Sequence, residues 1–180
     1  MGNFVGMRVA LLAERLERQG VMTMLLRGRI GEQSRAQTTA LPAETSGEVR
    51  ALIVEDDPVT RSLLRHRLAS IGCEIVAQCD SARDAWHSIA ISRPDLVTLD
   101  IEMPEFDGIG AVELFRKIRR ERRHTEVVII SASAFPSYRA LFLKEGAFAY
   151  VSKPIDFAAM ARQLRRIFPT LKAYEPDPAF

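Results

Sequence analysis

Four polar stretches of this 180-residue sequence carry side chains that could act together on a phosphoryl group. The acidic residues 55–57 follow the apolar run RALIV, and Asp100 ends the run VTLD. Ser131 ends VVIIS, and Lys153 follows AYVS directly. Carboxylates that converge in one crevice repel one another and hold their protons more tightly unless a cation joins them. The chemistry therefore depends on whether the fold brings these stretches together.

The combined set has the composition needed for phosphoryl transfer. Mg²⁺ takes oxygen ligands and typically binds through one or two carboxylates plus a phosphate. The ammonium group of Lys153 and the hydroxyl of Ser131 suit phosphoryl oxygens. Asp100 could attack phosphorus as a carboxylate nucleophile and form an acyl phosphate. Each stretch alone is more often a solvated loop, a helix cap or a turn, so this hypothesis rests on all four together.

From residue 49 onward, apolar runs alternate with helical patterns. The expected strands are residues 50–54, 73–79, 95–100, 126–131 and 148–152. The expected helices are residues 58–72, 81–94, 108–123, 136–146 and 155–168. Apolar strands separated by helices are typical of a parallel sheet covered on both faces, and right-handed crossovers then favour an α/β fold with a doubly wound five-stranded sheet. Its working site lies beyond the carboxyl ends of the strands, where all four polar stretches fall.

Four motifs occur in order between residues 50 and 168: ALIVEDDP, VTLDIEMPEFDG, VVIISASA and AYVSKP. Their order and intervals resemble the receiver domain of two-component response regulators, in its single-domain, CheY-like form. The resemblance covers about two thirds of the chain. It implies a flavodoxin-like fold with strand order 2-1-3-4-5 and helices on both faces.

The resemblance also implies roles for the acidic residues and their neighbours. Asp100 would be the phosphoacceptor. Glu55 and Asp56 would hold Mg²⁺, and Asp100 and the backbone carbonyl of Glu102 would complete the protein ligands. Glu102 and Ser133 occupy the variable positions that the family associates with the rate of acyl phosphate hydrolysis.

By the same resemblance, Ser131 and Lys153 would bind the phosphoryl oxygens. Tyr150 matches the aromatic residue that receiver domains use as a rotameric switch. In that mechanism Ser131 moves toward the phosphoryl group, and the ring of Tyr150 turns inward into the space that opens. The switch would remodel the face formed by residues 136–168, which we expect to bind a downstream protein partner. The alternative for Tyr150 is a half-buried strand residue with its hydroxyl in water.

Changes in pattern divide the chain into an N-terminal extension, a receiver domain and a C-terminal tail, residues 1–48, 49–168 and 169–180. The extension is expected to hold a short amphipathic helix in residues 1–20 and a flexible linker in residues 28–48. The helix could pair with a second copy in a homodimer, or dock on the receiver. The natural start could also lie downstream, at Met22 or Met24.

Composition limits the compartment and the partners. The formal net charge is +2, and no apolar run approaches the ~20 residues that a membrane span requires. Cys73 and Cys79 lack the further ligands of a zinc site. We therefore expect a cytoplasmic protein with no membrane partner. The basic run in residues 115–124 is interpreted as a solvated helix end that complements the helix dipole, so we expect no nucleic-acid partner.

These inferences combine into one expected function. The chain would be a stand-alone receiver that accepts a phosphoryl group on Asp100 from a histidine kinase or a histidine phosphotransfer protein. Residues 169–180 are too short for an enzyme or a DNA-binding module. The chain would therefore catalyse only its own Mg²⁺-dependent phosphoryl transfer and dephosphorylation, and would signal through a protein partner.

Three alternatives remain open at this point. One is a phosphorylation-independent interaction module that uses residues 1–20 for dimerisation or partner binding. A second is an aspartyl-phosphate hydrolase or phosphotransferase of the haloacid dehalogenase kind, although that family places its nucleophile after the first strand and Asp100 follows the third. The third is a DNA-binding regulator that uses the basic helix and would show salt-dependent retention on duplex DNA.

Overall fold

The computed structural model describes residues 48–104, 110–133 and 135–176. Contacts divide the chain into two units, residues 1–46 and 47–180, and every described element belongs to the second. The helix expected in residues 1–20 lies outside the described residues. In the part of the chain that is described, no helix is both long and apolar enough to cross a membrane.

The described residues form five strands and five helices in strict alternation. The strands are β1 (Val49–Val54), β2 (Cys73–Cys79), β3 (Leu96–Asp100), β4 (Glu126–Ser131) and β5 (Ala149–Ser152). The helices are α3 (Pro58–Ser70), α4 (Ala82–Ser92), α5 (Ala111–Glu121), α6 (Pro136–Lys144) and α7 (Phe157–Leu164). Each coincides with an expected element, and the largest difference is at the end of α7, which stops at Leu164 rather than at residue 168.

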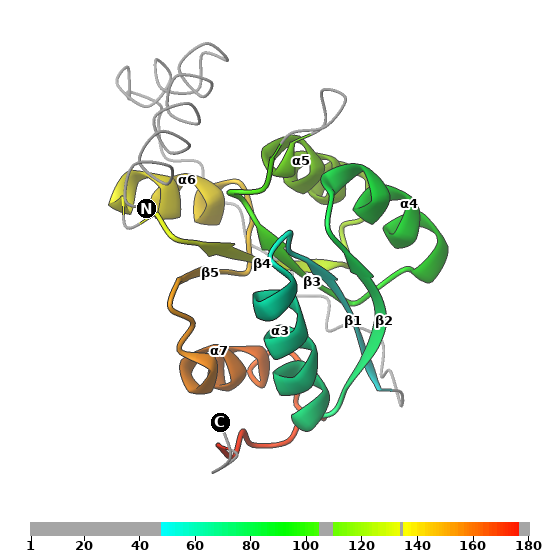
Figure 1. Cartoon of the computed structure of the whole chain (residues 1–180), viewed down its shortest axis with the longest axis vertical. Helices are drawn as coiled ribbons and strands as arrows, with labels where there is room; N and C mark the ends of the chain where they lie inside the picture. The colour runs from blue at the N-terminus through cyan, green and yellow to red at the C-terminus, as the bar shows by residue number, and fades with distance from the viewer. Residues whose placement is uncertain (1–47, 105–109, 134, 177–180) are drawn as a thin grey trace, which may run out of the picture. The chain divides into compact units, whose positions relative to one another are not determined.

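The five strands are all parallel and lie in the order β2-β1-β3-β4-β5. Figure 1 shows α3 and α7 on one face of the sheet and α4, α5 and α6 on the other. This arrangement confirms the expected doubly wound α/β fold. The strand order reverses between β1 and β3, and the carboxyl ends of the strands beside such a point are where α/β sheets bind ligands.

The three central strands, β1, β3 and β4, are mostly apolar and almost fully buried because helices cover both faces of the sheet. Leu52 and Ile53 are neighbours on opposite faces of β1, and both are fully buried. All the residues of β3 are buried as well. A strand with one solvated face would instead alternate between apolar and polar residues.

Side-chain caps determine where three of the helices begin. Asp57, Ser81 and Asp156 each accept a hydrogen bond from the backbone N–H three residues later, at 2.8, 3.2 and 2.9 Å. Pro58 follows the first of these caps, where a helix tolerates proline best. Asp57, the last acid after β1, therefore starts α3, and Glu55 and Asp56 are left to line the strand end.

The apolar residues of α3 are not all buried. The spacing of the apolar residues predicts one buried helical face made of Val59, Leu63, Leu64, Leu68 and Ile71. Leu64, Leu68 and Ile71 are indeed fully buried. Val59 and Leu63, however, are 74% and 42% exposed. Leu63 is about 100° around the helix from Leu64, so positions 59 and 63 face away from the sheet. The prediction that Val59 and Leu63 are buried was therefore wrong.

The basic residues of α5 pack against its neighbours. Arg116 donates two hydrogen bonds to the carboxylate of Glu145, after α6, at 2.9 and 3.0 Å. The Nζ of Lys117 lies 4.1 Å from the centroid of the Trp86 ring on α4. Arg119 donates to a backbone carbonyl at 2.9 Å. The expected solvated face is therefore wrong for these three cations, because α5 lies between α4 and α6 (Figure 1).

The segment after α7 packs back against α3. Leu171 is 3% exposed, and the backbone N–H of Lys172 donates to the carbonyl of Ile71 at 2.8 Å. The ring of Tyr174 makes an edge contact with that of Phe157, with centroids 5.0 Å apart. The first part of the expected tail therefore belongs to the core between α3 and α7.

Replacing Leu171 with alanine should lower the free energy of unfolding by about 2–4 kcal/mol, because it leaves a cavity in this core. The exposed neighbour Thr170 offers a control, since Thr170→Ala should change it by about 0.5 kcal/mol or less. Urea denaturation measures both values. Equal midpoints for the two variants would show that the segment adds nothing to the core.

Candidate functional site

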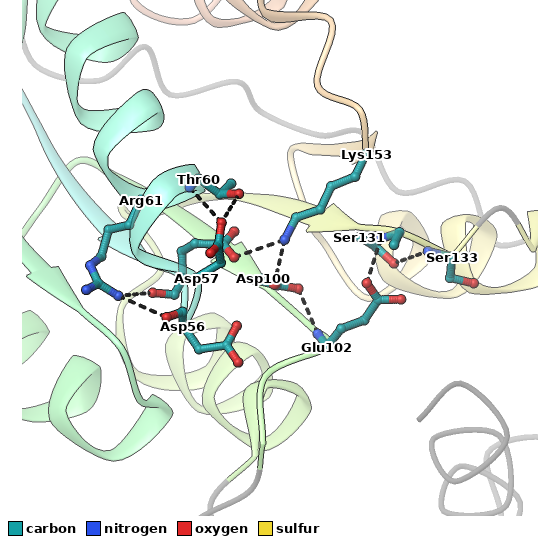
Figure 2. Close-up of polar contacts among 11 residues, drawn as sticks. Asp56, Asp57, Thr60, Arg61, Asp100, Glu102, Ser131, Ser133 and Lys153 are labelled. Carbon is teal, nitrogen blue, oxygen red and sulfur yellow. Dashed lines mark hydrogen bonds and ion pairs between the residues drawn. The ribbon is translucent and has the colours of Figure 1, made fainter. Parts of the chain in front are cut away.

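The polar residues at the strand ends meet at one edge of the sheet (Figure 2). Glu55 follows β1, Asp100 ends β3, Ser131 ends β4 and Lys153 follows β5. These four strands are neighbours and run parallel, so their carboxyl ends share an edge. The structure therefore brings together all four stretches that the sequence singles out.

Lys153 joins two of the carboxylates. Its Nζ donates to Asp100 Oδ2 at 2.8 Å and to Glu55 Oε1 at 3.0 Å. Burial opposes the charge of Lys153, but the hydrogen bond to Asp100 and the charges of Asp100 and Glu55 outweigh it and raise the pKa of the ammonium group. The lysine therefore stays charged and offsets part of the negative charge at the site.

Glu55 is the carboxylate of this group whose charged form is least favoured by its surroundings. Its side chain is completely buried, and burial, followed by the charge of Asp100, raises the pKa of Glu55 to about 7 against the opposing effect of Lys153. Its second oxygen, Oε2, is buried and has no hydrogen-bond partner among the described residues. An orphaned carboxylate oxygen of this kind is unfavourable unless something binds it.

The acidic residues fit a divalent cation. Ligand atoms of Glu55, Asp56 and Asp100 all lie within 4.8 Å of one another. Mg²⁺ holds its ligands at about 2.0–2.1 Å, so ligand atoms on opposite sides of the ion are about 4 Å apart. The hard oxygen donors and the orphaned Glu55 Oε2 suit this ion. The backbone N–H of Glu102 donates to Asp100 Oδ1 at 2.8 Å, so Glu102 lies beside the same group.

Arg61 is a member of the site that sequence reasoning missed. It lies on α3, and its Nη1 donates to the backbone carbonyls of Glu55 and Asp56 at 2.6 and 3.3 Å. These bonds hold the loop that carries both acids. A cation near the N-terminus of a helix opposes the helix dipole, and this was the only signal in the sequence that Arg61 had another role.

Ser131 and Tyr150 are linked through Ser133. The Ser131 hydroxyl is fully buried and accepts a hydrogen bond from the Ser133 N–H at 2.9 Å. The Tyr150 hydroxyl donates to the Ser133 carbonyl at 3.2 Å, and burial raises the pKa of this tyrosine. The alternative of a hydroxyl in water is therefore wrong. The ring is already inside, 7% exposed and beside Phe142, in this structure.

Glu102 makes a second contact that the sequence did not predict. Its Oε2 accepts a hydrogen bond from the backbone N–H of Ala132 at 2.7 Å. The side chain therefore spans from the end of β3 to the end of β4, across the edge that holds Asp100 (Figure 2).

Comparisons with known proteins agree with this geometry. Residues 51–165 match the family model described as the response regulator receiver domain. Response regulator GacA of Pseudomonas viridiflava is 30% identical over 130 residues, which cover 72% of this chain and 59% of GacA. A protein-glutamate methylesterase/protein-glutamine glutaminase of Archaeoglobus fulgidus is 33% identical over 124 residues, which cover 66% of this chain and 34% of that protein.

A solved structure shows the same fold. One chain of the crystal structure of the CheX–CheY–BeF3–Mg complex from Borrelia burgdorferi superimposes with a TM-score of 0.60 at 26% identity, covering 66% of this chain and 88% of that chain. This chain spans less than two thirds of the length of both curated relatives. The family model nevertheless covers more than half of it. The chain therefore belongs to the receiver-domain family of two-component response regulators.

Proposed function

We propose that this chain is the phosphoacceptor of a two-component phosphorelay, in which Asp100 receives a phosphoryl group from a histidine kinase or a histidine phosphotransfer protein. The observation that carries the proposal is the setting of Asp100. Its side chain is 3% exposed, with Lys153 on one oxygen and the Glu102 N–H on the other. A carboxylate held this way is oriented for attack on phosphorus.

The acidic cluster would hold the metal that this chemistry requires. Glu55, Asp56 and Asp100, with the backbone carbonyl of Glu102, are the proposed ligands. Bound Mg²⁺ would supply positive charge beside the phosphoryl oxygens. Arg61 would position the loop that carries Glu55 and Asp56, through the two carbonyls that it binds.

Phosphoryl transfer would then proceed by in-line displacement. An oxygen of Asp100 forms a bond to phosphorus as the phosphorus–nitrogen bond of the donor phosphohistidine breaks, and the electron pair of that bond stays on the imidazole. Lys153 remains beside Asp100 and donates to the phosphoryl oxygens. The Ser131 hydroxyl turns from Ser133 to the same group. The chain would catalyse only this transfer and the later hydrolysis of the acyl phosphate, whose rate Glu102 and Ser133 would tune.

Ser133 would carry the signal outward, because it bonds both Ser131 and Tyr150. When Ser131 turns toward the phosphoryl group, the Ser133 backbone loses one partner, and the position of the Tyr150 ring changes with it. The regulated surface is the face of residues 136–168. Leu143 on α6 is 38% exposed, and Phe135, next to this face, is 55% exposed, which supports a protein partner there. The population of the binding-competent form would rise with phosphorylation.

The proposed partners are proteins, and the proposed location is the cytoplasm, where the donor would act. The internal contacts of Arg116, Lys117 and Arg119 on α5 support a protein rather than a nucleic-acid partner. A surface that binds duplex DNA needs cations free to reach phosphates.

Incubation with Mg²⁺ and acetyl phosphate should add the mass of one phosphoryl group to the wild-type chain and none to Asp100→Asn. The reason is that the Asp100 carboxylate is the one held by Lys153 and by the Glu102 N–H. Intact-mass spectrometry measures this. Asp57→Asn is the matched control: it changes an acid at the same edge, asparagine keeps the α3 cap, and phosphorylation should persist. Equal phosphorylation of Asp100→Asn would place the acceptor elsewhere. The proposal would be refuted if the wild-type chain gained no phosphoryl group from acetyl phosphate and none from a phosphohistidine protein.

Beryllofluoride with Mg²⁺ should change backbone hydrogen exchange in residues 136–168, because the bonds of Ser133 link Tyr150 to the site. Exchange in α4, on the far side of α5 from α6 (Figure 1), should stay the same and serves as an internal reference. Tyr150→Phe, which removes only the hydroxyl bond to Ser133, should reduce the change. An unaltered 136–168 region with the mimic bound would rule out this face as the regulated surface.

A further inference from the structure

The side chain of Glu102 occupies a backbone donor close to the proposed phosphoacceptor. Its Oε2 accepts from the N–H of Ala132, the first residue after β4, at 2.7 Å. Its Oε1 is buried and has no hydrogen-bond partner in the described part of the chain. Figure 2 shows the carboxylate directed toward the segment that contains Ser131 and Ser133.

The Ala132 N–H lies just beyond the end of β4, the strand next to the one that carries Asp100. β3 and β4 are adjacent and parallel, and Asp100 pairs with Ile130, so the chain after Ile130 continues past the end of β3. The backbone N–H of Glu102 binds Asp100 Oδ1 at 2.8 Å. One residue therefore contacts the acceptor through its backbone and the neighbouring strand end through its carboxylate.

We propose that the Glu102 carboxylate competes with a phosphoryl group for the Ala132 N–H. It accepts this hydrogen bond in the unphosphorylated chain and has to release it when Asp100 carries a phosphoryl group. The inference rests on the proposed function, because it requires an anion on Asp100. A carboxylate and a phosphoryl oxygen compete for one donor, and at this short range the two anions also repel each other.

The contacts of Glu102 favour a displaceable anion. A charge-assisted hydrogen bond to Ala132 holds one oxygen. The other oxygen has lost water without gaining a partner, which is unfavourable. The favourable hydrogen bond of Oε2 is thus offset by the lost hydration of Oε1. The carboxylate is therefore displaced from the Ala132 N–H more readily than one with both oxygens bonded. Glu102 would set how readily the site accepts an anion.

Glu102 could act by competing for the Ala132 N–H or by affecting the water that hydrolyses the acyl phosphate. A phosphoryl mimic that does not hydrolyse reports only the first of these effects. The affinity for beryllofluoride, titrated in saturating Mg²⁺, should rise by about tenfold or more in Glu102→Gln, which keeps the shape of the side chain but loses its charge. Glu102→Asp keeps the charge but is too short to reach Ala132. It should also bind more tightly than the wild type, whereas a general charge effect would leave it unchanged.

Two further readouts complete the test. Asp57→Asn removes a carboxylate from the same edge without touching Ala132, and it should bind the mimic like the wild type. The Ala132 amide proton should exchange faster in Glu102→Gln than in the wild type when no mimic is present. Equal affinities of the wild type, Glu102→Gln and Glu102→Asp would overturn this inference and leave the proposed function standing. Failure of all four proteins to bind would overturn both.

Discussion

Two buried carboxylates, Glu55 and Asp100, share the ammonium group of Lys153 at the carboxyl edge of the sheet. Neither acid is stable as a charged group in that position without a partner, because buried charge loses its hydration. The three residues come from the ends of β1, β3 and β5, so the arrangement of the whole sheet is needed to make this contact. The contact forms only if the order and the lengths of these strands bring the two carboxylates and the ammonium group together.

The balance of charge at this edge stays incomplete. Lys153 bonds two of the three clustered carboxylates, and Glu55 Oε2 has no hydrogen-bond partner among the described residues. Oxygen donors of this kind fit a divalent cation, and the proposed function would add a phosphoryl group beside it. Two groups beside Asp100 already have partners: the Ala132 N–H donates to Glu102, and the Ser131 hydroxyl accepts from the Ser133 N–H. In the proposed function, an anion on Asp100 would redistribute these hydrogen bonds, and Tyr150 donates to the backbone carbonyl of Ser133.

The order of strands and helices and the acids at the strand ends could be predicted, because they are properties of short segments. The role of Asp57 was partly readable, since Pro58 after it marks the start of a helix. The contacts of Arg61 and of the Glu102 carboxylate could not be predicted from the sequence. Both bind backbone groups, and which backbone group lies within reach depends on the path of a loop. The exposure of Val59 also depends on how α3 is placed on the sheet.

By itself, the sequence determined the alternation of elements, the parallel sheet and the types of side chain that end each strand. Hydrophobic periodicity and local turn chemistry are enough for these. Only the tertiary structure decided which groups meet. Glu55 and Lys153 are 98 residues apart, and they touch because β1 and β5 end at the same edge. The tertiary structure likewise decided that the Glu102 carboxylate reaches Ala132, 30 residues away, since hydrogen bonding requires a distance that no local pattern encodes.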